Sequence, residues 1–90
     1  MTEIQLPHSA KAERALLGAL LINPQELSQI DLMPSDFYEK NNGAIYSAMI
    51  ALDLQGVSVD VVSVMNALQS MNKLDEVGGF DYLAGLANDV

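Results

Sequence analysis

Two adjacent glycines, Gly78 and Gly79, precede an apolar helical run near the end of a chain of 90 residues. Glycines in front of a helix can hold a phosphate, because backbone N–H groups point outward there. The phosphate-binding motifs require either a Gly-Lys-Ser/Thr sequence or Gly-x-Gly-x-x-Gly after a strand. The chain contains no Gly-Lys pair, and Asp81 would place a negative charge beside a bound phosphate. The two glycines are therefore predicted to separate two helices.

The residue types also give little support for metal binding or catalysis. His8 is the only histidine, there is no cysteine, and the aspartates do not follow the spacing of a calcium-binding loop. The neighbours Asp75 and Glu76 are typical of a solvated turn, and nothing resembles a nucleophile with a histidine partner, since His8 is the only candidate base of that kind. We therefore predict no catalytic residue, no bound cofactor and no metal site in this chain.

The charge balance argues against direct binding of nucleic acid. Twelve acidic residues outnumber four scattered basic residues, which leaves a net charge of −8. Binding to phosphate backbones requires clustered lysine and arginine. The longest apolar run, residues 15–22, is too short to span a membrane, and the N-terminus lacks the basic start of a signal peptide. We expect a cytoplasmic protein that contacts other proteins and neither nucleic acid nor membrane.

Helix caps and apolar spacing predict an all-α, compact orthogonal domain of about five main helices plus one or two short turns. The helices are expected over residues 10–22, over 24–30, from Asn41 or Asn42 to Gly56, over 61–71, and over 80–87. Ser9 and Asp60 are the predicted N-caps of the first and fourth helices, and Asn23 opens a capping box with Glu26.

The apolar and small residues suggest which positions maintain the fold. We expect Phe37 and Tyr82 to be buried, because aromatic side chains are scarce and large. Met49, Met65 and Met71 occupy apolar helical positions and are expected in the core. The residues predicted to have structural roles are Gly18, Phe37, Tyr38, Asp60, Gly78, Gly79 and Tyr82.

The chain resembles the N-terminal head domain of bacterial or phage replicative DNA helicases of the DnaB type. The resemblance covers roughly residues 6 to 88 and depends on the order and spacing of several short motifs. These are Pro7-His8-Ser9, Ala12-Glu13, Leu17-Gly18, Asp36-Phe37-Tyr38, Ile45-Tyr46, Gly56-Val57-Ser58-Val59-Asp60, Leu68, Leu74 and Val77-Gly78-Gly79-Phe80-Asp81-Tyr82-Leu83. Many members of the family have histidine at the position of Asn42 and glycine at that of Asn72.

The resemblance implies a role without chemistry. Residues 1–8 would form an N-terminal arm and residues 9–88 the helical head. The helical hairpin, the linker and the C-terminal P-loop ATPase, which binds ATP and magnesium, would lie outside this chain. The head would help to assemble a hexameric ring and to dock primase and a loader or initiator protein, with Met33 and Asn42 as candidate partner contacts. The isolated head is expected to dimerise only weakly.

Two alternatives remain open from the sequence. An acidic helical adaptor unrelated to replication would have a similar composition and charge. An enzyme with an unrecognised site would require a pocket that contains titratable groups with perturbed pKa values.

Overall fold

Helices make up the regular structure of residues 9–88, the part of the chain that the computed structural model describes. In chain order the elements are α1 (Ala10–Ile22), the 3-10 helices η1 (Pro24–Gln29) and η2 (Pro34–Asp36), α2 (Lys40–Leu54), α3 (Val61–Ser70), α4 (Leu74–Val77) and α5 (Gly79–Asn88). No strand occurs in these described residues, so the all-α prediction is confirmed. The predicted N-terminal arm, residues 1–8, lies outside them.

Several helix ends follow from local sequence. The Ser9 hydroxyl accepts a hydrogen bond from the backbone N–H of Ala12 at 3.2 Å and caps α1. Asn72, with φ of 59°, takes the left-handed conformation after α3, as expected of an asparagine at that place. Gly78 has φ of 111° and Gly79 has φ of 73°, so this pair turns the chain between α4 and α5.

Two predicted helix starts differ from the structure. Residues after Asn23 form the 3-10 helix η1, and the Asn23 side chain makes no capping hydrogen bond. The Asn23 carbonyl instead accepts from the N–H of Glu26 at 3.0 Å, which is the tighter 3-10 pattern. Helix α2 begins at Lys40, before Asn41 and Asn42, and the backbone N–H groups of Tyr38 and Glu39 just ahead of it donate to the distant side chain of Glu13.

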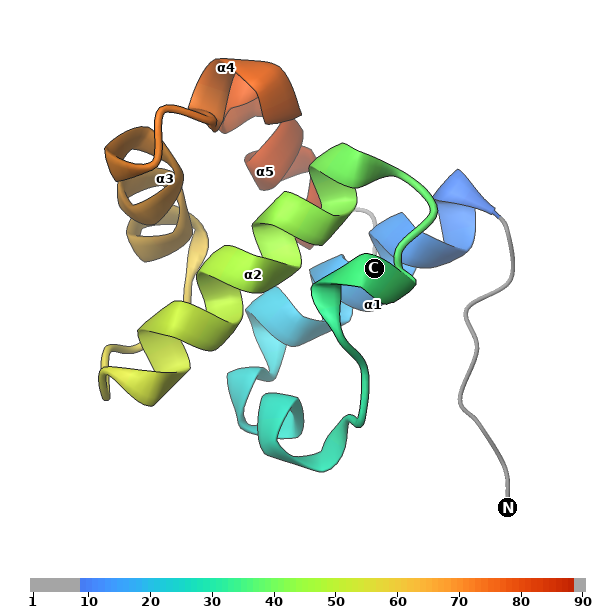
Figure 1. Cartoon of the computed structure of the whole chain (residues 1–90), viewed down its shortest axis with the longest axis vertical. Helices are drawn as coiled ribbons and strands as arrows, with labels where there is room; N and C mark the ends of the chain where they lie inside the picture. The colour runs from blue at the N-terminus through green and yellow to red at the C-terminus, as the bar shows by residue number, and fades with distance from the viewer. Residues whose placement is uncertain (1–8, 89–90) are drawn as a thin grey trace.

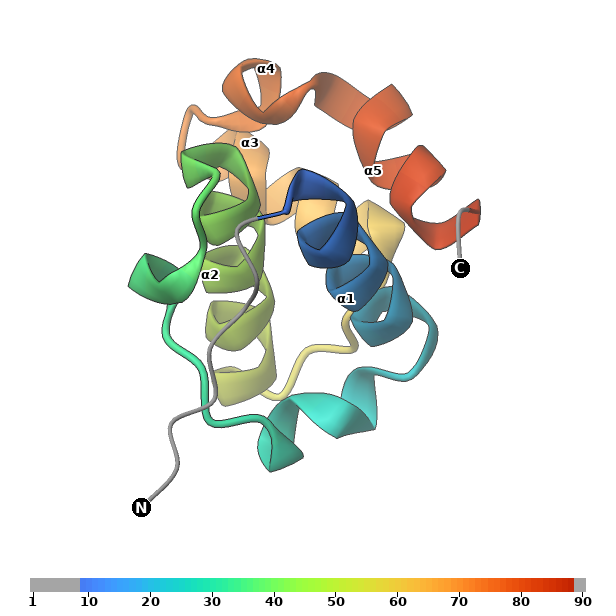
Figure 2. The same ribbon diagram turned by 90° about the vertical axis from the view of Figure 1, so that its right-hand side faces the viewer.

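Helix α2 lies across the middle of the molecule, with the other helices arranged around it (Figure 1). Helices α1 and α2 run beside each other, and α5 packs along α1 (Figure 2). Helix α3 contacts both α2 and α5, so the last three helices close one side of the domain. In the described part of the chain, no helix is both long enough and apolar enough to cross a membrane.

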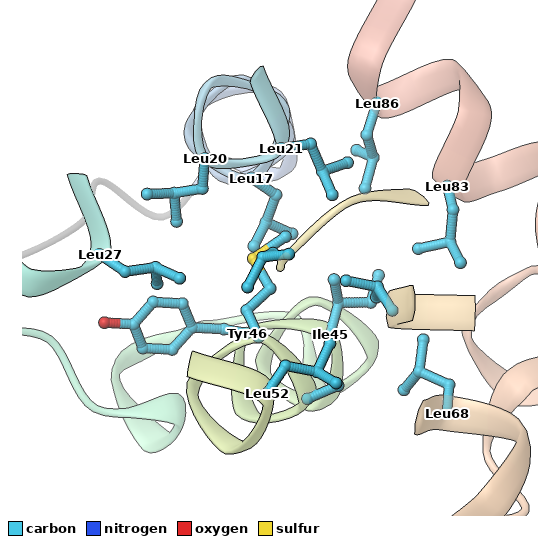
Figure 3. Packing of buried hydrophobic residues seen from close by; sticks show 14 of the residues in the cluster. Leu17, Leu20, Leu21, Leu27, Ile45, Tyr46, Leu52, Leu68, Leu83 and Leu86 are labelled. Atoms are coloured by element: carbon cyan, nitrogen blue, oxygen red, sulfur yellow. The ribbon is translucent and has the colours of Figure 1, made fainter. Parts of the chain in front are cut away.

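The core lies where α1, α2, α3 and α5 meet. Leu17, Ile45, Leu68 and Leu83 point toward one another there, whereas Leu20 points to the side where Leu27 lies (Figure 3). All of these except Leu27, which is 7% exposed, are almost completely buried. The core prediction is wrong for one methionine: Met71 is 40% exposed, because α3 ends at Ser70 and Met71 is its C-cap residue.

Two glycines allow backbone segments to approach closely. A Cβ at Gly43 would lie 2.7 Å from the carbonyl oxygen of Pro34, so η2 packs directly on α2 only because this side chain is missing. A Cβ at Gly78 would lie 2.7 Å from the Cβ of Tyr82. These contacts fix η2 on α2, and α4 on α5.

The N-cap of α3 provides a test of local helix stabilisation. The Asp60 carboxylate accepts from the N–H of Ser63 at 2.8 Å, and the Ser63 hydroxyl accepts from the N–H of Asp60 at 2.9 Å. We expect Asp60→Ala to lower the free energy of unfolding by about 0.5–2 kcal/mol in thermal melts, because this reciprocal cap is lost. Asp60→Asn, which can still accept the bond, is the control and should lose less. An unchanged melting temperature for Asp60→Ala would contradict the capping role.

Candidate functional site

A buried carboxylate connects α1 to the start of α2. Glu13 lies in the first turn of α1 and is 0% exposed. Its carboxylate accepts hydrogen bonds from the backbone N–H of Tyr38 at 2.6 Å and of Glu39 at 3.2 Å. It also accepts from the side-chain amide of Asn42 at 3.0 Å. The negative charge therefore lies at the N-terminal end of α2, where the N–H groups lack helical partners and the helix dipole is positive.

Asn42 extends this network to α5. Its side-chain oxygen accepts a hydrogen bond from the Tyr82 hydroxyl at 2.7 Å, while its amide donates to Glu13. The side chain of Asn42 is 2% exposed. The three residues thus tie α1, α2 and α5 together through polar contacts beside the apolar core.

The electrostatic surroundings keep the Tyr82 hydroxyl protonated. Partial burial raises the pKa of Tyr82, and this outweighs the opposite effect of the Arg14 guanidinium. The pKa of Tyr46 is also raised, first by burial and then by the carboxylates of Asp36 and Asp31. The Tyr46 hydroxyl donates to the carbonyl of Leu32 at 3.0 Å. Both tyrosines therefore act as neutral hydrogen-bond donors at physiological pH.

This arrangement is suited to holding helices in place. Within residues 9–88, every buried side-chain nitrogen or oxygen has a hydrogen-bond partner. The same residues contain no group of three or more histidine, aspartate or glutamate side chains that could hold a metal ion. The Glu13 carboxylate accepts three hydrogen bonds, all from groups of its own chain. We therefore assign Glu13 a role in positioning the helices.

The structure places the predicted site residues in different surroundings. Phe37 is buried at 7% exposure, and Tyr82 is only partly buried. Gly18 is buried within α1. The side chain of Tyr38 is 64% exposed, although its backbone N–H lies in the Glu13 network.

The two candidate partner contacts differ from each other. Met33 is 65% exposed, and it remains a candidate. Asn42 does not fit a direct contact with another protein, because both ends of its amide are used inside the domain and the side chain is covered. The prediction for Asn42 is therefore corrected: it connects Glu13 to Tyr82.

The sequence reading missed the role of Glu13. Glu13 lies in the first turn of α1, and its carboxylate accepts from the backbone N–H groups of Tyr38 and Glu39, just ahead of α2. A signal was present in the spacing: Glu13, Leu17 and Leu20 recur at i, i+4 and i+7, so the glutamate lies on the apolar face of α1. A carboxylate on a buried face requires hydrogen-bond donors from elsewhere in the fold.

The chain is similar in sequence to replicative DNA helicases. It is 41% identical over 86 residues to the replicative DNA helicase DnaC of Bacillus subtilis (strain 168), a match that covers 93% of this chain and 19% of the relative. It is 40% identical over 87 residues to the replicative DNA helicase DnaB of Geobacillus stearothermophilus, with the same two coverages. The chain thus spans about a fifth of the length of these curated relatives.

A solved structure matches the fold as well. The crystal structure of the N-terminal domain of DnaB helicase from Mycobacterium tuberculosis is similar with a TM-score of 0.88 and 31% sequence identity. The match covers 96% of this chain and 64% of that chain. The model of the DnaB-like helicase N-terminal domain matches residues 5–90. Fold, sequence and family model agree, and the chain belongs to the family of DnaB-like helicase N-terminal domains.

Proposed function

We propose that this chain is the non-catalytic N-terminal scaffold of a hexameric, ATP-dependent replicative DNA helicase. In this proposal it contributes to ring assembly and docks primase and a loader or initiator protein in the cytoplasm, at the replication fork. The match of residues 5–90 to a helicase N-terminal domain carries the proposal. ATP, magnesium and the DNA-binding loops would belong to the C-terminal ATPase of the parent protein.

The chemistry of the described residues supports a scaffold. The polar groups that are buried serve contacts between helices, as Glu13 and Asn42 do. Large apolar side chains remain on the surface, among them Met33 at 65% and Leu54 at 82% exposure. We propose them as contacts with other proteins. An adaptor unrelated to replication has less support, because the relatives are named as replicative helicases.

Docking can be tested by isothermal titration of this chain with the primase of the same organism. We expect saturable binding, and we expect the parent helicase without residues 1–90 to lose primase binding while its ATPase activity persists. The chain alone should hydrolyse no ATP. The docking function would be refuted if the truncated parent bound primase as tightly as the intact parent did.

Ring assembly can be tested on the chain alone by sedimentation equilibrium. Each copy carries a charge of −8, so association requires like charges to approach. We expect a monomer, or a monomer–dimer mixture that shifts toward dimer with protein concentration and with added salt, which screens the repulsion. A hexamer that persists at low micromolar protein would contradict this expectation and would mean that the head closes the ring unaided.

A further inference from the structure

A groove opens between η2, the first half of α2 and the connection from α3 to α4. Its volume is about 530 Å³. Figure 2 shows η2 and the α3–α4 connection on the same side of α2. The lining that matters for binding consists of four apolar residues and two lysines, namely Pro34, Phe37, Ala44, Met71, Lys40 and Lys73. We call this hollow the Lys40–Lys73 groove.

The groove concentrates positive charge in an acidic chain. The whole sequence contains four lysines and arginines, and two of them, Lys40 and Lys73, line this one hollow. Both lysines are exposed. Their acidic neighbours in the sequence, Glu39 and Asp75, line two other hollows instead. The groove is therefore a local basic site on a molecule whose net charge is −8.

Two further carboxylates, Asp36 and Glu76, lie close to the lysines in the sequence, and neither lines the groove. Asp36 belongs to η2, and its side chain accepts a hydrogen bond from the backbone N–H of Met33 at 2.8 Å. This bond closes the first turn of η2 and holds the carboxylate on its own backbone. Lys40 and Lys73 are the two charged residues in the lining of the groove.

The floor of the groove is apolar and adaptable. Met71 reaches it from the end of α3 and is 40% exposed, although the apolar spacing of α3 would place it in the core. Phe37 and Pro34 supply rigid apolar surface on the opposite side. Methionine side chains adjust to the shape of a bound group, because three bonds rotate and the sulfur is polarizable.

We propose that the Lys40–Lys73 groove binds a short segment of a partner protein in which a bulky apolar side chain is flanked by carboxylates. The apolar side chain contacts Met71 and Phe37, and the carboxylates pair with the two ammonium groups at the rim. An apolar centre with a charged rim is the usual composition of a protein interface, and opposite charge on the partner adds specificity and speeds association. The inference deepens the proposed docking function and rests on it.

A second copy of this chain fits the groove less well. Every copy carries the same charge of −8, so a partner of this kind adds repulsion over the whole surface. Nucleic acid also fits poorly, because the two lysines are surrounded by an acidic molecule and a phosphate backbone requires a longer basic track. A partner segment with few charges beyond its own carboxylates lacks the large net charge of a second copy, and it does not require a long basic track.

The test uses a fluorescein-labelled peptide in which leucine and phenylalanine are flanked by aspartate and glutamate. We expect saturable binding in fluorescence anisotropy that weakens with added salt. The amide NMR signals of Gly43, Ala44 and Met71 should shift during the titration. A peptide with lysine in place of its acidic residues is the control for apolar contact alone and should not bind. Binding of a single-stranded oligonucleotide to the same amides, in preference to the acidic peptide, would overturn the proposal.

A matched pair of charge reversals tests the position of the site. Lys73→Glu should weaken peptide binding about tenfold, through repulsion of the carboxylates. Lys11→Glu changes the net charge equally at an exposed position of α1 that does not line the groove, and it should change binding by less than about twofold because solvent and salt screen exposed charges. Both variants should keep the wild-type melting temperature. Equal effects of the two substitutions would show a general charge effect and would overturn the proposal that the peptide binds in the Lys40–Lys73 groove.

The primase titration separates this inference from the docking function. If primase binds and Lys73→Glu weakens neither primase nor peptide binding, the groove proposal fails and the docking function stands. If the truncated parent binds primase as well as the intact parent does, the docking function fails, whatever the peptide does.

Discussion

Glu13→Ala should lower the free energy of unfolding by about 3–5 kcal/mol, because three buried or partly buried donors lose their acceptor together. The donors are the N–H groups of Tyr38 and Glu39 and the amide of Asn42, all within 3.2 Å of the carboxylate. The change also leaves a cavity beside the core, since the Glu13 side chain is completely covered. Urea denaturation followed by circular dichroism measures the effect.

Glu13→Gln is the control that separates charge from shape. Glutamine fills the same space and its single oxygen can still accept hydrogen bonds, but its amide nitrogen would face a backbone N–H just ahead of α2. We expect it to lose about half as much stability as Glu13→Ala does. Amide hydrogen exchange should accelerate most at Tyr38 and Glu39 in both variants, because these N–H groups lose their acceptor or face the glutamine amide. Protection of both amides at the wild-type level would refute the positioning role of Glu13.

Phe37→Ala is expected to lower the free energy of unfolding by about 3–5 kcal/mol, the range found for buried aromatic side chains replaced by alanine. The Phe37 ring is 7% exposed, and its centroid lies 5.1 Å from that of Tyr46 with the planes tilted by 40°. Phe37 also follows η2 directly, so its loss should loosen η2 from α2. A chain of this size is marginally stable, so a large part of it should unfold at 37 °C.

The matched control is Phe80→Ala, which removes the same atoms from a ring that is 48% exposed. It should cost less than about 1 kcal/mol, because little packing is lost on the surface. Thermal melts of the two variants give the comparison directly. Equal melting temperatures for Phe37→Ala and Phe80→Ala would show that Phe37 does not contribute to the core.

The sequence alone determined the features that depend on neighbours within a few positions. The caps at Ser9 and Asp60 involve residues three apart, and the left-handed ends at Asn72 and Gly78 depend on the residue itself. The all-α class follows from the same local signals, summed along the chain. The resemblance to a DnaB-type head, which the family match confirmed, rested on the order of short motifs.

Only the tertiary structure decided which side chains meet across the fold. The hydrogen bonds of Glu13 join residues 25 to 29 positions apart, and that of Tyr82 joins residues 40 positions apart. The spacing of residues in the sequence can place Glu13 on a buried face of α1. It cannot identify the hydrogen-bond donors, because these depend on how α1 packs against α2. For the same reason, the sequence did not predict that Met71 is exposed and lines the same groove as Lys40. Which side chains are buried depends on how the helices pack. A buried charge requires hydrogen-bond partners, and these come from the elements that pack against it.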